Sequence, residues 1–156
     1  MEKENKKLLF EEVYTNFKLH FYREVFGRFA EREATLTTVE SFCMEVIYAM
    51  NNPTINEFAS FIKISSPNAA YKVNNLVKKG YIEKVQSEKD KREYNLVVTE
   101  KYKNYYNISA SYVNKIMERA QENMTEKEWN DFCRGLEVIR QQQIKDTPEI
   151  GSRKEL

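Results

Sequence analysis

The side chains of this chain that could do chemistry are mostly basic, and they gather in its middle. Residues 63–103 contain ten lysines or arginines and five acidic residues, a net charge of +5, whereas the rest of the chain contains 15 basic and 19 acidic residues, a net charge of −4. A basic segment between acidic flanks suits contact with a polyanion such as nucleic acid. A solvated surface of mixed charge is the alternative interpretation, because an excess of five charges is modest.

Residue types for catalysis or metal binding are scarce. The chain has one histidine, His20, so a zinc cluster of histidine and cysteine ligands is not expected. Cys43 and Cys133 form neither a CxxC motif nor a disulfide framework, and no partner histidine is evident for an activated thiolate. The four glycines build neither a dinucleotide-binding motif nor a phosphate-binding loop. We therefore expect no enzyme activity, no cofactor and no metal site.

A helix predicted between Ser66 and Gly80 carries polar side chains away from its apolar face. Ser66 is expected to cap it, with Pro67 at its first position and Gly80 just after its end. Asparagine can bond adenine, lysine can bond guanine or a phosphate, and a helix start with free N–H groups can hold a phosphate. The candidate DNA contacts on this helix are Ser65, Ser66, Asn68, Tyr71, Lys72 and Asn75. A solvated helix face and, for the serines, simple capping are the alternatives.

A charged connector, residues 86–93, joins two short β-rich runs, residues 81–85 and 94–98. Two such runs around a polar connector predict a hairpin. The connector is too long for a tight turn and is expected to project as a mobile basic loop. Its candidate DNA contacts are Lys89, Asp90, Lys91 and Arg92. An ordinary charged turn is the alternative.

The elements that must position these side chains are predicted to be mainly helices, because the chain has only four glycines and three prolines. Apolar residues recur every three or four positions from Phe10 to Phe29, which predicts one amphipathic helix over residues 5–33. Capping-box patterns at Thr37 and Thr54 predict that a helix begins after each of them.

Two more helices are predicted after the hairpin. Thr99 can cap a long helix over residues 100–123, and a capping box at Thr125 begins the last one. The first and last helices carry more aromatic residues than one small domain needs, so they are expected to form a dimer interface. These residues are Phe10, Phe17, Trp129 and Phe132.

The stretch from Ser65 to Thr99 holds an ordered set of motifs. They are the helix Ser66–Leu76, then Lys79-Gly80-Tyr81-Ile82, then Asp90-Lys91-Arg92, and finally Leu96-Val97-Val98-Thr99. In this order they resemble the MarR family of bacterial transcription regulators. The resemblance implies a mainly α fold with a small β-hairpin wing, which is a winged helix-turn-helix with N- and C-terminal dimerisation helices. It also implies that Arg92 enters a DNA minor groove, with Asp90 as its brace.

The domain boundaries follow from the same resemblance. We expect a single domain over residues 1–145 and a disordered tail over residues 146–156. Within that domain, residues 5–33 and 100–145 are the expected dimerisation helices, and residues 36–99 the winged helix-turn-helix.

The chain departs from the family pattern in places. Tyr102 replaces a usual glycine after the wing, and Tyr71 stands where many relatives have arginine, so base preferences cannot be transferred. Relatives commonly sense small ligands, oxidants or metals between their DNA-binding and dimerisation helices. The candidate effector-pocket residues here are Phe17, His20, Cys43, Ile47, Tyr102 and Tyr106. Core packing is the alternative for these side chains.

These patterns predict a cytoplasmic homodimer that binds a palindromic operator in double-stranded DNA. It is expected to act as a transcriptional repressor and to be released by a small aromatic effector. No membrane span is expected, since no stretch without a charged residue exceeds 11 residues. The alternative function is a winged-helix protein–protein interaction module without DNA binding, because a net charge of +1 is a weak electrostatic signature.

Overall fold

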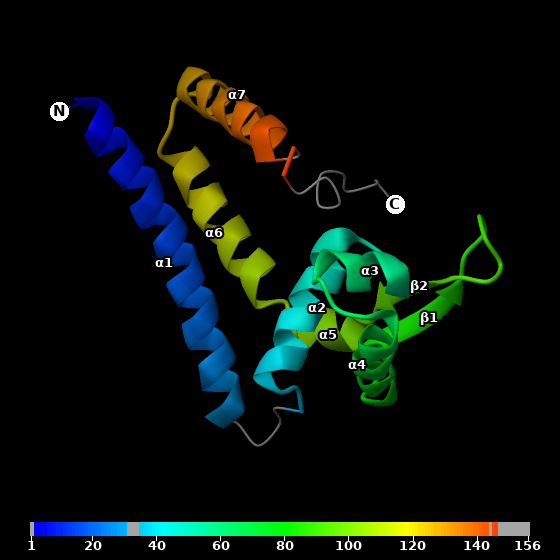
Figure 1. Cartoon of the computed structure of the whole chain (residues 1–156). Coiled ribbons are helices and arrows are strands. Elements are labelled where there is room, and N and C mark those ends of the chain that lie inside the picture. Colours follow the sequence, from blue (N-terminus) through cyan, green and yellow to red (C-terminus); the bar gives the residue numbers. More distant parts are fainter. Residues whose placement is uncertain (1, 31–34, 144, 147–156) are drawn as a thin grey trace.

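The structure, a computed structural model, describes residues 2–30, 35–143, 145 and 146 (Figure 1). In chain order its elements are α1 (Glu2–Ala30), α2 (Thr38–Met50), α3 (Ile55–Phe61), α4 (Ser66–Lys78), β1 (Ile82–Gln86), β2 (Tyr94–Val98), α5 (Glu100–Tyr106), α6 (Ile108–Glu122) and α7 (Glu126–Gln143). The predicted mainly helical fold with one hairpin is therefore confirmed. None of the described helices is long and apolar enough to cross a membrane.

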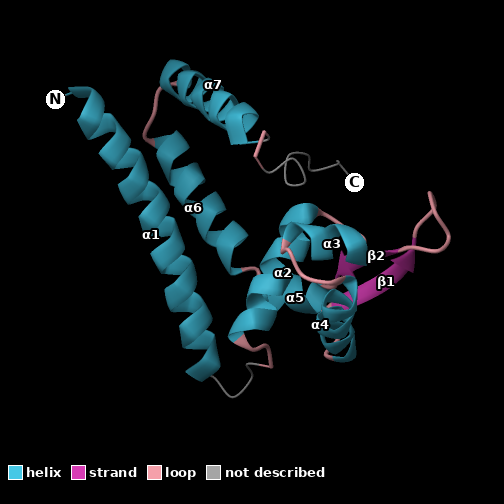
Figure 2. Cartoon of the chain, in the orientation of Figure 1, coloured by secondary structure: helices cyan, strands magenta, loops and turns pink. Residues whose placement is uncertain are grey.

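The molecule has two parts that differ in how their apolar residues are covered. Helices α1 and α6 run side by side as an arm, and α7 follows α6 at the arm's far end (Figure 1). Helices α2–α5 and the hairpin form a lobe, from which the hairpin projects (Figure 2). The described core lies almost entirely in the lobe, whereas α7 buries no residue completely.

The core of the lobe is a cluster of apolar side chains from all its elements. Met44 and Ile47 of α2, Phe58 of α3, Leu76 of α4 and Leu96 of β2 are each 0% exposed. Burying each such side chain contributes about 1.5–3 kcal/mol. This packing holds α3 and α4 at a fixed angle to the hairpin.

Local capping fixes where the helices begin. Thr37 accepts a hydrogen bond from the Glu40 N–H at 3.3 Å, and the Glu40 carboxylate accepts one from the Thr37 N–H at 2.7 Å. The same reciprocal pair forms at Thr54 before α3 and at Thr125 before α7. All three capping boxes expected from the sequence are confirmed.

The hairpin is joined to the rest of the lobe by backbone bonds. β1 and β2 pair antiparallel, with Ile82 opposite Val98 and Gln86 opposite Tyr94. The Leu96 N–H also donates to the Pro53 carbonyl at 2.8 Å, which anchors β2 to the α2–α3 connection. At the other end, Gly80 has a φ of 79°, a left-handed conformation that glycine adopts without strain, as expected after a helix.

Three expectations about helix ends are wrong. Ser65, not Ser66, is the N-cap of α4, because the Ser66 hydroxyl donates instead to Asn56 at 2.9 Å. Thr99 makes no side-chain cap, since its hydroxyl donates to the Gly80 carbonyl at 2.7 Å. The long helix expected over residues 100–123 is divided at Asn107, whose backbone is not helical. The predicted end of the first helix at residue 33 and most of the tail over residues 146–156 lie outside the described residues.

Candidate nucleic-acid interface

Helices α3 and α4 form a helix-turn-helix whose turn is fixed by the backbone. The Lys63 N–H donates to the Ser60 carbonyl, and the Ile64 N–H donates to the Ala59 carbonyl at 3.0 Å. Lys63 itself has a φ of 56°, which reverses the chain without a glycine. The turn and the shared core therefore set the direction of α4.

One face of α4 is used for folding and the opposite face is open. Ala69, Val73 and Leu76 are fully buried against the lobe. Asn68 is exposed, and 69% of the accessible surface of Tyr71 is exposed. Lys72 and Asn75 are half-buried on the flank of the same face. An exposed tyrosine on a well-packed helix has no role in the core, so its ring and hydroxyl are available to a ligand.

The two serines at the start of α4 are both engaged within the protein. Ser65 accepts from the Asn68 N–H at 3.4 Å, and Ser66 bonds Asn56. Ser65 therefore caps α4, which is the interpretation given above as the alternative to a phosphate contact. Both residues remain exposed, so each can still present an oxygen to a phosphate.

The wing loop, residues 87–93, is ordered by its own hydrogen bonds. The Ser87 N–H donates to the Glu93 carbonyl at 2.9 Å, and the Gln86 amide donates to the Lys91 carbonyl at 2.7 Å. The Ser87 hydroxyl also accepts from the N–H groups of Lys89 and Asp90. The loop projects as expected, and these bonds give it a defined conformation.

Arg92 is fixed at its base and open at its tip. One oxygen of Asp90 accepts from the Arg92 N–H at 3.0 Å and from Nε at 3.2 Å, and the other accepts from the guanidinium at 3.2 Å. These bonds hold the pKa of Asp90 below its usual value. The Arg92 side chain is nevertheless 90% exposed, so its charge is directed to solvent in a preset geometry. Lys89 and Lys91 lie exposed beside it.

A residue that the sequence reasoning missed connects the wing to α4. Lys84 on β1 donates from Nζ to the Asn74 side-chain oxygen, across ten residues of sequence. Both residues are exposed on the side of the lobe that the helix and hairpin share. Only Ile82 of β1 is buried, so the strand lacks the alternation of exposed and buried residues that could have singled out Lys84, and its partner could come only from the three-dimensional packing.

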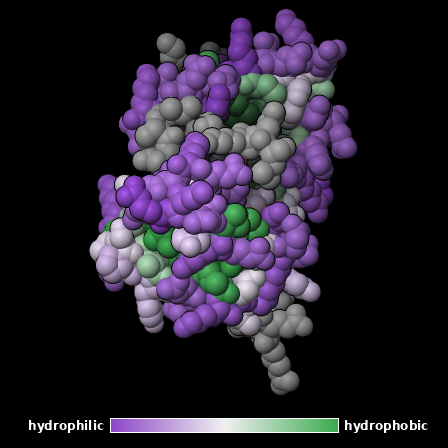
Figure 3. Space-filling view, turned by 90° about the vertical axis from the view of Figure 1, so that its right-hand side faces the viewer, coloured by the Kyte–Doolittle hydropathy of each residue, from purple (hydrophilic) through white to green (hydrophobic). Residues whose placement is uncertain are grey.

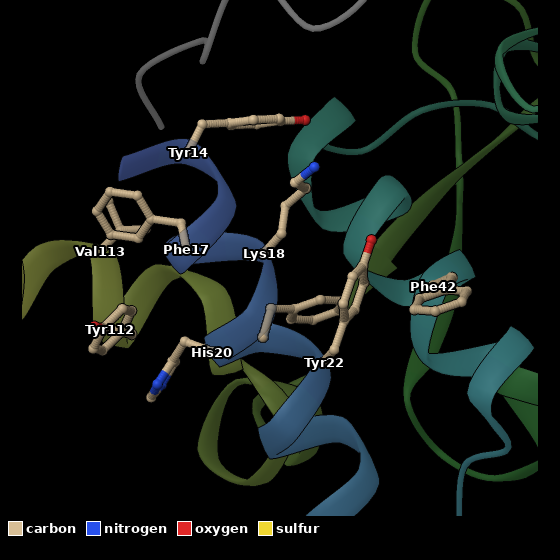
Figure 4. A pocket seen from close by; sticks show the side chains of 9 residues that line it. Tyr14, Phe17, Lys18, His20, Tyr22, Phe42, Tyr112 and Val113 are labelled. Carbon is tan, nitrogen blue, oxygen red and sulfur yellow. The ribbon is translucent and has the colours of Figure 1, made fainter. Parts of the chain in front are cut away.

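The six predicted effector-pocket residues are not brought together. Phe17 and His20 line a cleft of about 440 Å³ between α1, α2 and α6, together with Phe42 and Tyr112 (Figure 4). His20 stacks on Tyr112 with ring centroids 3.5 Å apart. The remaining four of the six are in the core of the lobe and are Cys43, Ile47, Tyr102 and Tyr106.

Two of these buried residues illustrate core packing, which is the alternative to a role in an effector pocket. The Tyr102 hydroxyl donates to Glu45 at 2.6 Å, and burial with this nearby carboxylate raises the pKa of Tyr102. Burial likewise raises the pKa of the Cys43 thiol, which disfavours the reactive thiolate. Among the described residues, no group of three or more histidine, cysteine or acidic side chains is placed to hold a metal ion.

Comparisons with known proteins agree with this architecture. Residues 36–94 match the model of the MarR family. FabT of Streptococcus pneumoniae, in a crystal structure with DNA, is 22% identical, with 91% of this chain and 99% of that chain covered and a TM-score of 0.58. The transcriptional regulator Tm0710 of Thermotoga maritima is 16% identical, with 91% and 98% covered and a TM-score of 0.60.

A third solved structure bears a small molecule. MepR of S. aureus bound to ethidium bromide is 16% identical, with 88% of this chain and 95% of that chain covered and a TM-score of 0.54. The comparison with curated proteins gave no match. At these identities the likeness to solved structures shows the fold, and the family model adds the sequence pattern of the helix-turn-helix and wing. The resemblance first drawn from the motifs is therefore confirmed: residues 36–94 match the MarR-family model, and the chain has the fold of solved MarR-family proteins.

Proposed function

We propose that the protein is a homodimeric transcriptional repressor that binds a palindromic operator in double-stranded DNA. The observation that carries the proposal is the pairing of an exposed polar face on α4 with a braced, solvent-directed Arg92 on the adjacent wing. A helix of this kind fits the major groove, and a wing arginine fits the neighbouring minor groove. The helix contacts are Ser65, Ser66, Asn68, Tyr71, Lys72 and Asn75, and the wing contacts are Lys89, Asp90, Lys91 and Arg92.

Salt dependence tests DNA binding directly. Duplexes selected from a random pool by the full-length protein should share an inverted repeat, because two-fold protein symmetry matches two half-sites. Fluorescence anisotropy on the selected duplex should show log K falling with log salt by about 0.9 for each phosphate contacted. An affinity that stays flat between low and moderate salt would favour the protein-interaction module instead.

Dimerisation is supported by apolar surface that the single chain leaves open. On α1, Leu8, Leu9 and Phe10 each expose at least half of their accessible surface. On α7, Trp129 and Phe132 pack against each other, with no residue of the helix fully buried. Apolar side chains left open on surface helices are typical of a protein–protein interface.

Truncation tests the placement of that interface. Deleting residues 1–30 removes the α1 half of the apolar surface, so light scattering should report monomer or aggregate. A well-folded dimer of the truncated chain would show that the interface lies elsewhere.

The cleft between α1, α2 and α6 supports release by a small aromatic effector. It lies where the arm meets the lobe, and its walls include Phe17, Phe42 and Tyr112 (Figure 4). Ethidium is a suitable probe because a neighbour of the same fold binds it. In a fluorescence titration without DNA, Phe17→Ala should weaken ethidium binding, and Leu19→Ala, on the exposed side of α1, should not. Equal affinities for the two variants would place the ethidium site outside this cleft.

A further inference from the structure

Lys84 of the hairpin and Asn74 of α4 meet on an exposed surface that the contacts proposed above leave unused. Helix α4 and strand β1 lie side by side (Figure 1). Lys84 stands opposite Leu96 in the hairpin register, so its side chain leaves the hairpin on the same side as the buried Leu96. Its Nζ donates to the Asn74 Oδ1 at 2.5 Å. The helix and the hairpin therefore bring one lysine and one amide to a single point.

Asn74 lies on the open face of α4. It follows Tyr71 by three residues and precedes Lys78 by four, a spacing that places the three side chains on one side of a helix. All three are exposed, whereas Val73 and Leu76 are buried in the core. Asn74 is therefore on the surface that faces the major groove under the function proposed above.

The bond to Lys84 fixes the direction of the Asn74 amide. An ammonium group has three donors and no acceptor, so it can bond the amide oxygen but not the amide nitrogen. The Asn74 oxygen is therefore turned toward Lys84, and Nδ2 keeps both of its protons for another partner. Lys84 Nζ also keeps two protons. Together the two side chains offer hydrogen-bond donors to a ligand.

The positive charge at this point is not neutralised by a carboxylate. Lys84 forms no ion pair with any residue that the structure describes. Its neighbour Glu83 stands opposite Val97, so the Glu83 side chain leaves the hairpin on the other side. A cation beside the Asn74 oxygen attracts a second acceptor and repels a donor such as the amino group of adenine.

We propose that the Asn74–Lys84 pair selects guanine over adenine at one position of each operator half-site. Asparagine alone bonds adenine through both amide groups, since its oxygen accepts from N6 and its nitrogen donates to N7. Lys84 occupies that oxygen, so the pair offers Nδ2 and Nζ as two donors, which match the N7 and O6 acceptors of guanine. Lys84 is thus a specificity-determining residue. This inference rests on the proposed DNA binding and adds a base preference to it.

Selection of duplexes from a random pool by the full-length protein tests the preference. The operator selected by the wild type should carry a guanine in each half-site that selection by Lys84→Met replaces with adenine. Two duplexes that differ only at this base pair are then compared by fluorescence anisotropy. The wild type should bind the guanine duplex about tenfold more tightly. Lys84→Met keeps the aliphatic stem and frees the Asn74 oxygen, so it should prefer the adenine duplex.

Two further variants assign the effect to the pair. Adding Asn74→Ala to Lys84→Met should remove the adenine preference, because the side chain that bonds adenine is lost. Lys78→Met removes another exposed lysine from the same face of α4 and is the matched control, which should keep the preference for guanine. A circular-dichroism melt of each variant distinguishes lost binding from lost folding.

Each other outcome overturns the inference. If Lys84→Met binds DNA and selects the wild-type operator, the inference fails while the proposed function stands. An equal loss of affinity on both duplexes would make Lys84 a phosphate contact that reads no base. An adenine preference that persists without Asn74 would assign the reading to another side chain. If the wild type binds no duplex at all, the proposed function fails together with the inference.

Discussion

Arg92 is the residue whose removal should separate DNA binding from folding most cleanly. Its side chain is 90% exposed and is joined only to Asp90 among the described residues, so Arg92→Ala removes no core contact. The melting temperature should therefore change little. Affinity for the operator should fall, most on duplexes with A·T-rich flanks, where a narrow minor groove concentrates negative potential.

The size of the effect follows from the number of wings. A dimer carries two copies of Arg92, and if each replaces one counterion, the variant loses about 1.8 from the slope of log K against log salt. Between 50 and 200 mM salt, a fourfold change, the wild type should then lose about 12-fold more affinity than Arg92→Ala does. Arg92→Lys should recover only part of the affinity, because lysine is more strongly hydrated and enters a narrow groove less readily.

Anisotropy titrations of both variants on A·T-flanked and G·C-flanked duplexes, at several salt concentrations, provide the measurement. Lys127→Gln on α7 serves as a control for the loss of one exposed cation. Equal and small losses on both duplexes, with an unchanged salt slope, would refute the assignment. Arg92 would then be an ordinary surface charge held by Asp90.

Other variants test the base contacts, the core and the ion pair. Tyr71→Ala should change the preferred base at particular operator positions, by about 1–3 kcal/mol, and a selection experiment that returns the wild-type operator would contradict this. Phe58→Ala should lower the free energy of unfolding by about 3–5 kcal/mol in a urea titration, because Phe58 is completely buried. Gly80→Ala should cost about 1 kcal/mol, since alanine is strained at a φ of 79° although its Cβ has space. Partial burial alone would raise the pKa of Glu40, but its bonds from Lys79 and Thr37 outweigh this and lower it below 4.5. The stability that Glu40 contributes is thus present above pH 4.5 and lost as pH falls through the lowered pKa, so acid titration should bring the wild type and Glu40→Gln together.

The parts of the fold that sequence predicted well are those whose cause is local. A capping box joins residues three apart, so the starts of α2, α3 and α7 could be read from Thr37, Thr54 and Thr125. The wing brace is local as well, since Asp90 and Arg92 are two residues apart. In each case the partners of the side chain are fixed by chain geometry before any tertiary packing.

The failures have distant causes. Adjacent serines at 65 and 66 were equally good caps, and a bond from Ser66 to Asn56 decided between them. Helical periodicity continued through Asn107, whose amide instead bonds Tyr48, 59 residues away in sequence. The predicted effector-pocket residues are divided between the arm and the core of the lobe, because composition and spacing do not show which of two apolar environments a side chain occupies.

The surface carries a further clue to function that folding does not explain. Hydrophilic residues cover most of the face shown in Figure 3, with apolar residues confined to separate patches. Tyr71 is exposed although α4 has a complete apolar face without it, and Arg92 is exposed although Asp90 fixes its base. Keeping a large aromatic ring and a braced cation in solvent adds little to the stability of the lobe. An exposed tyrosine on the helix and an exposed arginine on the wing suit the major and minor grooves of duplex DNA. These two residues therefore support the proposed DNA binding more strongly than the net charge of the chain does.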